Sequence, residues 1–350
     1  MRILSRSARL NSLVYLGLYA YNSIAISRIA SSIVKFGRAF GADTLWCALQ
    51  GPSLIRLALP VARGLGIPLL TEVFDPPIWE LREYSADRLS TTLLLREFGE
   101  AIRSSRACAT ASLPMANEYE REYGVKTVAI LPSLDAGLAL PPAQEVHPGR
   151  ELIIGLAGQM YATEEWKALI SALDTVGWQI GGRNVRIRVL GRWFRFGFDV
   201  NKPMCIEYLG WHTQENAVRL LSEADILYCP YWFSPAFEVE ARLSFPSKLP
   251  TYLAAGRPVL FHGPEYASAA GFLKDNAAGF LCNSNSPSVI INALLALATD
   301  TNLYARLTKN GRTAFDKYFT LSSLRQSFAT FLGAKEDFLL PVEDSPKVMS

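Results

Sequence analysis

Strand and helix signals alternate twice along this chain, and this alternation limits its fold more than any other feature. Between residues 41 and 135, short apolar runs such as 44–49 and 68–73 separate amphipathic segments such as 53–65. The same rhythm returns from residue 152 to residue 318. Alternation of this kind predicts parallel sheets covered by helices. We therefore predict an α/β protein with two Rossmann-like, doubly wound domains.

The length of the chain and a proline-rich segment indicate two domains joined by a linker. The sequence has 350 residues, half of them apolar, which is enough to bury one core in each of roughly two domains. Residues 136–150 lack periodicity and contain three prolines, which is typical of a linker. We expect an N-terminal domain over 1–140 and a C-terminal domain over 150–320. A final helix over 321–335 is expected to pack back on the N-terminal domain.

The formal net charge is only +3, which gives no argument for nucleic-acid binding, but the charge is unevenly placed. Residues 1–71 contain eight basic residues and a single acid, Asp43. Such asymmetry favours an anionic neighbour, either phospholipid or a phosphorylated ligand, and an ordinary solvated basic face explains it equally well. The apolar run 13–26 is shorter than the ~20 residues that a membrane span needs. We expect it to form a helix that packs on a sheet or lies at a membrane interface.

The cysteines and several missing motifs narrow the function further. The five cysteines are widely spaced and show no metal-ligand spacing, which suits a reducing compartment such as the cytoplasm. The chain has no phosphate loop ending in Gly-Lys-Ser/Thr, no His-Glu-x-x-His and no nucleophile elbow. The pair Glu238 and Glu240 is interpreted as a solvated loop, not as a metal site. No metal or other cofactor is expected.

The most informative stretch runs from Ser244 to Pro264. A Pro-Ser-Lys turn opens a predicted helix over 248–255, which Ser247 can cap. The start of a helix beside Lys248 attracts a pyrophosphate through the helix dipole and a point charge. Gly256 ends the helix, and a buried strand leads to the loop 262–265 at the same edge of the sheet. An ordinary helix start with a solvated lysine is an equally good interpretation.

At this point the sequence resembles the C-terminal domain of glycosyltransferase family 4, whose members have the GT-B fold. The resemblance covers the second alternation, and the N-terminal half is a weaker match at 66–75, 111–112 and 130–132. The matching C-terminal segments are Gly158, 208–211, 220–226, 229–231, 245–249, 252–256, 258–259 and 278–281.

The resemblance implies a retaining, metal-independent hexosyl transfer from a UDP- or GDP-sugar to a glycan or lipid-linked acceptor, as in polysaccharide biosynthesis. The reducing compartment that the cysteines suggest leads us to expect a cytoplasmic enzyme, and the basic N-terminal segment would supply a peripheral membrane contact. Asp75 follows a strand and could orient the acceptor hydroxyl, although a turn-capping aspartate is the simpler interpretation. The residues expected to bind the donor are Gly158, Gln159, Arg192, Ser247, Lys248, Thr251, His262 and Glu265. For His262, a loop histidine satisfied by the backbone is an equally good interpretation.

Three departures from the family pattern leave alternatives open. Thr251 stands where a glutamate commonly grips the ribose, and Gln159 and Glu164 stand where an arginine and a lysine are common. The family usually has further strands before the segment that matches residue 44, so we expect a shortened N-terminal domain or an upstream sequence. A catalytically impaired scaffold subunit and a nucleotide-sugar epimerase of GT-B fold are the alternatives. The aromatic residues Trp193, Phe194, Phe196 and Phe198 could form a sugar platform or a hydrophobic lid, and ordinary core or interdomain packing is the favoured interpretation.

Overall fold

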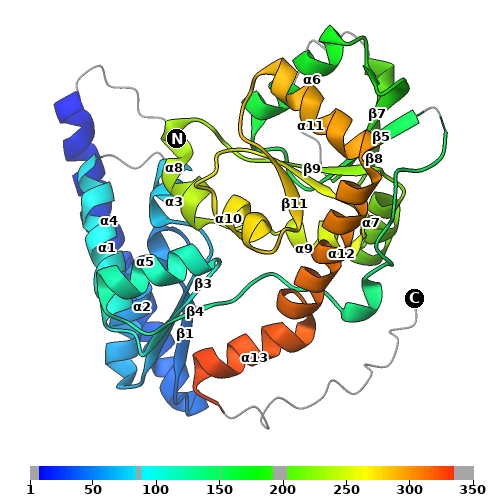
Figure 1. Ribbon diagram of the computed structural model, residues 1–350. Helices are drawn as coiled ribbons and strands as arrows, with labels where there is room; N and C mark the ends of the chain where they lie inside the picture. Colours follow the sequence, from blue (N-terminus) through cyan, green and yellow to red (C-terminus); the bar gives the residue numbers. More distant parts are fainter. Residues whose placement is uncertain (1–7, 84–87, 150, 192–202, 335–350) are drawn as a thin grey trace. The chain divides into compact units, whose positions relative to one another are not determined.

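The computed structural model describes residues 8–83, 88–149, 151–191 and 203–334 (Figure 1). The chain divides into two compact units. Unit 1 combines the chain up to Ile130 with the residues from Arg325 onward, and unit 2 runs from Leu131 to Leu324. Each unit is built on a parallel sheet with helices, which confirms the predicted α/β fold class.

In the described part of unit 1, four parallel strands follow one another in the order β1-β2-β3-β4. Right-handed crossovers that all run in one direction place their helices on one face of the sheet. The elements of unit 1 are α1 (Ala8–Phe40), β1 (Leu45–Ala48), α2 (Gly51–Leu65), β2 (Leu69–Val73), α3 (Pro77–Glu83), α4 (Arg88–Arg103), β3 (Ala107–Thr110), α5 (Leu113–Tyr123) and β4 (Thr127–Ala129).

Helix α13 (Leu321–Leu332) supplies apolar side chains to the core of unit 1. Phe331 is buried in one cluster with Leu70 and Ala107 of the sheet, and Phe328 packs against the same cluster. The rings of Trp46 and Phe328 meet edge to face, with their centroids 5.5 Å apart. The first and last parts of the described chain therefore build one core together.

Helix α1 is much longer than the predicted helix over 13–26, because no proline interrupts it and it ends only at Gly41, whose φ is +72°. It packs closely on α2: a Cβ on Gly37 would lie 2.9 Å from Leu65, and one on Gly64 would lie 2.7 Å from Val34. Among the described residues no single helix is both long and apolar enough to cross a membrane. The two helices α11 and α12, with a bend of 88° between them, are together long and apolar enough for a membrane span, judged by length and composition alone.

The sheet of unit 2 has the parallel order β11-β10-β9-β5-β7-β8, with the short β6 paired antiparallel to the start of β7. Counted from β5, this is the 3-2-1-4-5-6 order of dinucleotide-binding sheets. The elements are β5 (Glu151–Ala157), α6 (Thr163–Thr175), β6 (Gln179–Ile180), β7 (Arg183–Leu190), β8 (Ile206–Gly210), α7 (Gln214–Ser222), β9 (Ile226–Pro230), α8 (Glu238–Leu243), α9 (Leu249–Ala254), β10 (Val259–His262), α10 (Ser268–Asp275), β11 (Gly279–Cys282), α11 (Pro287–Thr299) and α12 (Thr301–Tyr318).

Helices cover the sheet of unit 2 on both faces. One core contains β5 side chains such as Ile154 with α6 and α11, and the other contains Ala157 with α7, α9 and α12. Apolar side chains therefore cover both faces of the sheet. A ligand can bind only at the edges where the strands end.

Residues 131–149, predicted as the end of the N-terminal domain and a linker, belong to unit 2. They lack a regular strand, yet their backbone is fixed: Leu140 N donates to Ala254 O (2.8 Å) and Ala143 N to Gly256 O (3.0 Å). Gly256 ends α9 with a φ of +69°, and a Cβ there would lie 2.5 Å from Pro141 O. The segment thus runs along the end of α9 as a packed strap.

A buried carboxylate, Asp225, anchors the end of this strap. Its oxygens accept from the His147 backbone N (2.7 Å), the His147 Nδ1 (2.9 Å) and the Ile153 N (2.7 Å). Arg257 Nη2 lies 2.7 Å from His147 Nε2. Because a guanidinium only donates, Nε2 is the acceptor, and the ring proton sits on Nδ1, facing Asp225.

Among the α-helices and β-strands of the described residues, three short ones were not predicted: α3, β6 and α8. The prediction of a solvated loop at Glu238 and Glu240 is wrong, because both residues lie in α8 and Glu240 is buried. The segment is short and carries two acids, so its sequence lacks the apolar periodicity by which a buried helix is recognised.

We predict that Asp225→Ala lowers the free energy of unfolding by about 3 kcal/mol or more, because it leaves buried N–H donors without an acceptor. Urea denaturation followed by circular dichroism measures this. Asp300→Ala is the matched control: Asp300 caps α12 through Leu303 N (2.9 Å) at an exposed site, and its loss should cost only about 1 kcal/mol. Equal losses in the two variants would contradict the anchoring role.

Candidate functional site

The strand order of unit 2 reverses between β5 and β9, which pair with each other at the centre of the sheet. In open parallel sheets, ligands bind at this switch point, outside the carboxyl ends of the strands. The segments that leave this edge begin at Gly158 after β5, at Gly191 after β7 and at Tyr231 after β9. These three strand ends define the candidate site.

Lys248 reaches this edge from the start of α9. Its Nζ lies 3.5 Å from Gln159 O and 4.6 Å from the centre of the Tyr161 ring. The side chain is half-buried, and burial lowers the pKa of Lys248. Among the described residues it has no carboxylate partner. A partly dehydrated ammonium without an anion beside it is an arrangement that attracts phosphate.

Two glycines, Gly158 and Gly191, leave the backbone beside Lys248 without side chains. Gly158 has a φ of +87°, and a Cβ there would lie 3.7 Å from Lys248 Cε. Gly191 has a φ of +123°, and its Cβ would lie 3.0 Å from Gly158 O. Side chains rarely adopt such backbone angles, so glycine is required at both positions. A ligand can therefore approach the main chain of both loops closely.

The local structure at Ser247 differs from the prediction. The N-cap residue is Lys248, no side chain caps the helix, and Ser247 is exposed. Helix α9 has only six residues, and Pro250, which lacks an N–H, occupies its first turn, so the helix start supplies few free amides and little of the predicted dipole. The attraction for a phosphate group therefore comes mainly from the charge of Lys248 and from the backbone of the loops at Gly158 and Gly191. The start of α9 contributes less to it than predicted.

The side chain of His262 is enclosed in the core of unit 2. It is only 1% exposed, its Nε2 lies 3.0 Å from Ser284 O, and its Nδ1 lies 2.7 Å from the Tyr228 hydroxyl. Burial lowers the pKa of His262 to about 4, so the ring is neutral near pH 7. A carbonyl only accepts, which places the proton on Nε2 and makes Nδ1 the acceptor of the Tyr228 hydroxyl. His262 therefore holds strands together from inside the core.

An aromatic group that the sequence did not reveal lies beside Lys248. The rings of Tyr161 and Trp232 are 4.7 Å apart, and Trp232 Nε1 donates to Tyr161 O (3.0 Å). Phe237 stacks on Trp232 at 5.2 Å. The aromatic group, Tyr161, Tyr231, Trp232 and Phe237, comes from the loops that follow β5 and β9.

A buried glutamate holds the second of these loops. Glu165, in the first turn of α6, accepts a hydrogen bond from Phe233 N at 2.8 Å through Oε1. Burial raises the pKa of Glu165. In the sequence it is one of two adjacent glutamates at a helix start, which look alike, so no local signal separates the buried residue from the solvated Glu164.

The remaining predicted residues lie in different surroundings. Gln159 is exposed next to Gly158, and Thr251 is half-buried one turn after Lys248. Glu265 is exposed and accepts from Asn283 Nδ2 (2.7 Å). Asp75 is half-buried at the carboxyl end of β2 in unit 1. Arg192 lies outside the described residues, as do Trp193, Phe194, Phe196 and Phe198.

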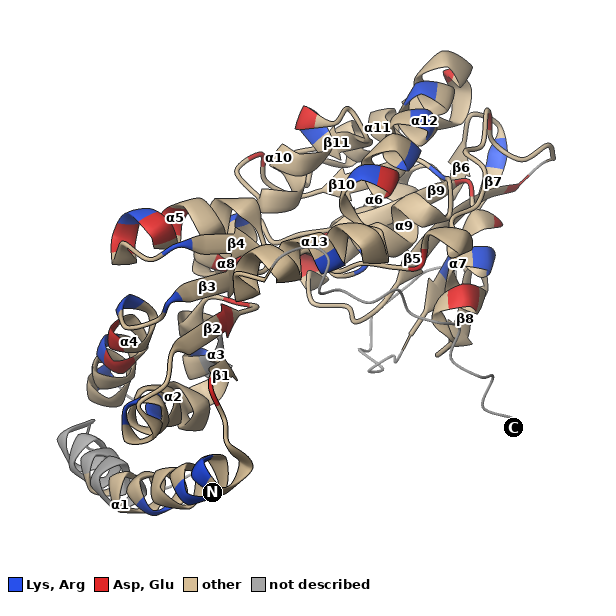
Figure 2. Ribbon diagram, turned by 90° about the horizontal axis from the view of Figure 1, so that it is seen from below, with Lys and Arg blue, Asp and Glu red and all other residues tan. Residues whose placement is uncertain are grey.

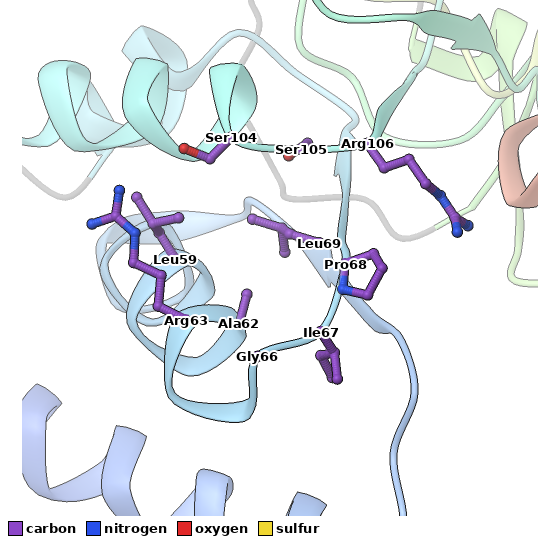
Figure 3. A pocket seen from close by; sticks show the side chains of 10 residues that line it. All are labelled: Leu59, Ala62, Arg63, Gly66, Ile67, Pro68, Leu69, Ser104, Ser105 and Arg106. Atoms are coloured by element: carbon purple, nitrogen blue, oxygen red, sulfur yellow. The ribbon is translucent and has the colours of Figure 1, made fainter.

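A hollow of about 560 Å³ in unit 1 is drawn in Figure 3. It lies at the amino ends of β2 and β3, which is the wrong edge for a ligand of a parallel sheet. Backbone groups there are already paired, for example Arg106 N with Leu69 O at 2.8 Å. Its lining residues are Leu59, Ala62, Arg63, Gly66, Ile67, Pro68, Leu69, Ser104, Ser105 and Arg106.

No family model and no curated protein sequence matches this chain. Its structure is similar to that of HepE from Anabaena, solved with UDP, at 15% identity and a TM-score of 0.64 over 87% of this chain and 82% of that one. It is also similar to sucrose-phosphate synthase from Thermosynechococcus elongatus (12%, 0.67, over 89% and 78%) and to α,α-trehalose 6-phosphate synthase from Burkholderia multivorans (15%, 0.61, over 88% and 75%). The likeness shows the fold, which is that of GT-B glycosyltransferases.

We predict that acid weakens the folded state through His262. In the unfolded chain a histidine takes up a proton near pH 6.5, whereas His262 resists it until about pH 4. The free energy of unfolding should therefore fall as the pH drops from 6.5 to 4, by up to about 3 kcal/mol from this residue. His262→Gln should flatten that part of the curve, and urea titrations across pH 4–7 measure it. An unchanged slope would show that His262 is protonated in the folded protein.

Proposed function

We propose that this chain is a glycosyltransferase that takes a sugar from a nucleotide-sugar donor. The observation that carries the proposal is Lys248: a half-buried ammonium with no carboxylate partner among the described residues, beside Gly158 at the switch point of unit 2. HepE, which shares the fold, was solved with UDP and with UDP-glucose, and this supports a UDP-sugar as donor. A GDP-sugar is the other donor that we propose. We also propose that the chain is a member of glycosyltransferase family 4.

The chemistry follows from the charge. As the bond between sugar and diphosphate breaks, negative charge develops on the leaving phosphate. Lys248 stands at a fixed place to neutralise that charge, because the aromatic ring of Tyr161 lies against its ammonium. In this proposal the protein itself supplies the positive charge, and the transfer is metal-independent. The retaining course of the hexosyl transfer rests on the family resemblance alone.

The acceptor side of the proposal involves unit 1. Asp75, at the carboxyl end of β2, is proposed to orient the acceptor hydroxyl. The acceptor is proposed to be a glycan or a lipid-linked sugar, as in polysaccharide biosynthesis in the cytoplasm. A scaffold subunit that binds a donor without turnover is the alternative that Thr251 favours, because its side chain cannot replace the charge of the family's glutamate.

Lys248→Ala should lower the rate of donor turnover at least about 100-fold, because removing one preformed stabiliser of the leaving charge has this effect in other enzymes. Release of UDP or GDP from a series of nucleotide sugars measures it, with circular dichroism to verify folding. Lys274→Ala, at an exposed lysine of α10, is the matched control and should be silent.

Three results are informative. Full turnover in Lys248→Ala would refute the proposed site. Donor binding without turnover in the wild-type protein would favour the scaffold. Partial recovery in Lys248→Arg would show that charge at this position matters more than the shape of the lysine.

We also propose that α1 rests on an anionic membrane surface. In the described part of α1, exposed apolar side chains gather on one side: Ile29 is 47% exposed, Phe36 70% and Phe40 77%. No acid occurs in the sequence of α1, whose basic residues include Arg28 and Lys35. In Figure 2 the coloured part of α1 carries blue but no red. An apolar stripe bordered by basic residues is typical of helices that lie in a lipid interface.

Phe36→Ser combined with Phe40→Ser should reduce binding to vesicles of mixed anionic and zwitterionic phospholipid at least about tenfold, because two aromatic side chains no longer insert. Co-sedimentation measures this. Leu113→Ser is the matched control, since Leu113 is an exposed apolar residue of α5. Equal binding of both variants, or equal binding of the wild type to purely zwitterionic vesicles, would contradict the proposal.

A further inference from the structure

An exposed tryptophan stands at the same edge of unit 2 as Lys248. Trp211 follows the last residue of β8 and is 72% exposed. Within the described part of the chain its ring makes no aromatic contact and its Nε1 no hydrogen bond. Single exposed apolar side chains are common on protein surfaces, but tryptophan is enriched at binding interfaces, because its indole combines a large apolar face with one N–H donor.

The local backbone directs Trp211 to the carboxyl edge. The pairing of β7 with β8 shifts register between Val189 and Leu190, so that Leu190 pairs with Gly210 and Leu209 is the extra residue. Bulges of this kind re-aim the residues that follow them and are frequent beside functional sites. His212 then fastens the turn through its Nε2, 3.0 Å from Leu209 O. The position of Trp211 is therefore fixed from both sides.

A continuous path of bare backbone joins Lys248 to Trp211. Lys248 lies against Gly158, Gly191 lies against Gly158 O, and Gly191 N donates to Gly210 O at 2.7 Å. Trp211 is the next residue. The path crosses from β5 over β7 to β8, which is two strand spacings or about 10 Å. A nucleoside diphosphate spans a similar length between its diphosphate and its base.

We infer that Trp211 is the platform on which the base of the nucleotide stacks. The inference rests on the proposed function, because it takes the diphosphate to lie at Lys248. With the diphosphate there and the ribose over the glycines, the base reaches the indole ring. Stacking is tolerant of base identity, since every base has a flat face, so Trp211 contributes affinity for the nucleotide more than choice among bases.

Isothermal titration calorimetry with UDP, GDP and inorganic pyrophosphate tests the inference. Trp211→Ala should weaken the binding of UDP and GDP about tenfold or more, as expected for the loss of one base–aromatic stack, and leave pyrophosphate binding unchanged. Trp211→Phe should restore most of the affinity. Lys248→Ala should weaken all three ligands. Tyr208→Ala removes an exposed aromatic residue from the same strand and should change none of them.

The outcomes separate the two ideas. If Trp211→Ala binds UDP and GDP like the wild type while Lys248→Ala does not, the stacking platform is wrong and the donor site stands. If Trp211→Ala also loses pyrophosphate, the tryptophan acts on the loop structure and the stacking role is wrong. If the wild-type protein binds neither nucleotide, the proposed function fails and the inference fails with it.

Discussion

The central place of β5 is the constraint on which the candidate site of unit 2 depends. This strand pairs with β7 on one side and with β9 on the other, so the chain winds outward in both directions from it. The loops that follow β5 and β9 lead to opposite sides of the sheet. They therefore leave a crevice between them at the carboxyl ends of these two strands. Gly158 lies at that edge, and Lys248 is brought to it by the packing of α9 on the sheet.

Much of the fold could be predicted, because its signals are local. Helix α5 is an example: Ser112 caps it by accepting from Met115 N at 3.1 Å, and Gly124 ends it with a φ of +67°. Both events depend on residues within one turn of the chain. The stop at Gly256 followed by β10 was predictable for the same reason. Helix α1 exceeded its predicted length because apolar composition alone does not mark where a helix begins.

The candidate site could be predicted only in part, because its chemistry depends on distant partners. Lys248 was singled out by its motif, yet the lack of a carboxylate partner among the described residues is a property of the folded chain. The surroundings of His262 could not be predicted, because Tyr228 and Ser284, which occupy its two nitrogens, are far from it in sequence. Glu165 and the aromatic group were missed because nothing local distinguishes a buried glutamate at a helix start from a solvated one.

The contribution of α13 to unit 1 affects the order in which the protein can mature. Phe328 and Phe331 complete a cluster whose other members lie between Leu70 and Ile130. A chain emerging from the ribosome therefore carries an incomplete unit 1, with that side of its sheet uncovered, while the uninterrupted stretch of unit 2 is already available to fold. Domains usually mature in sequence order during synthesis. Here the cluster built from residues 70–130 cannot be completed until Phe328 and Phe331 have been made, and until then that side of the sheet is open to unwanted contacts.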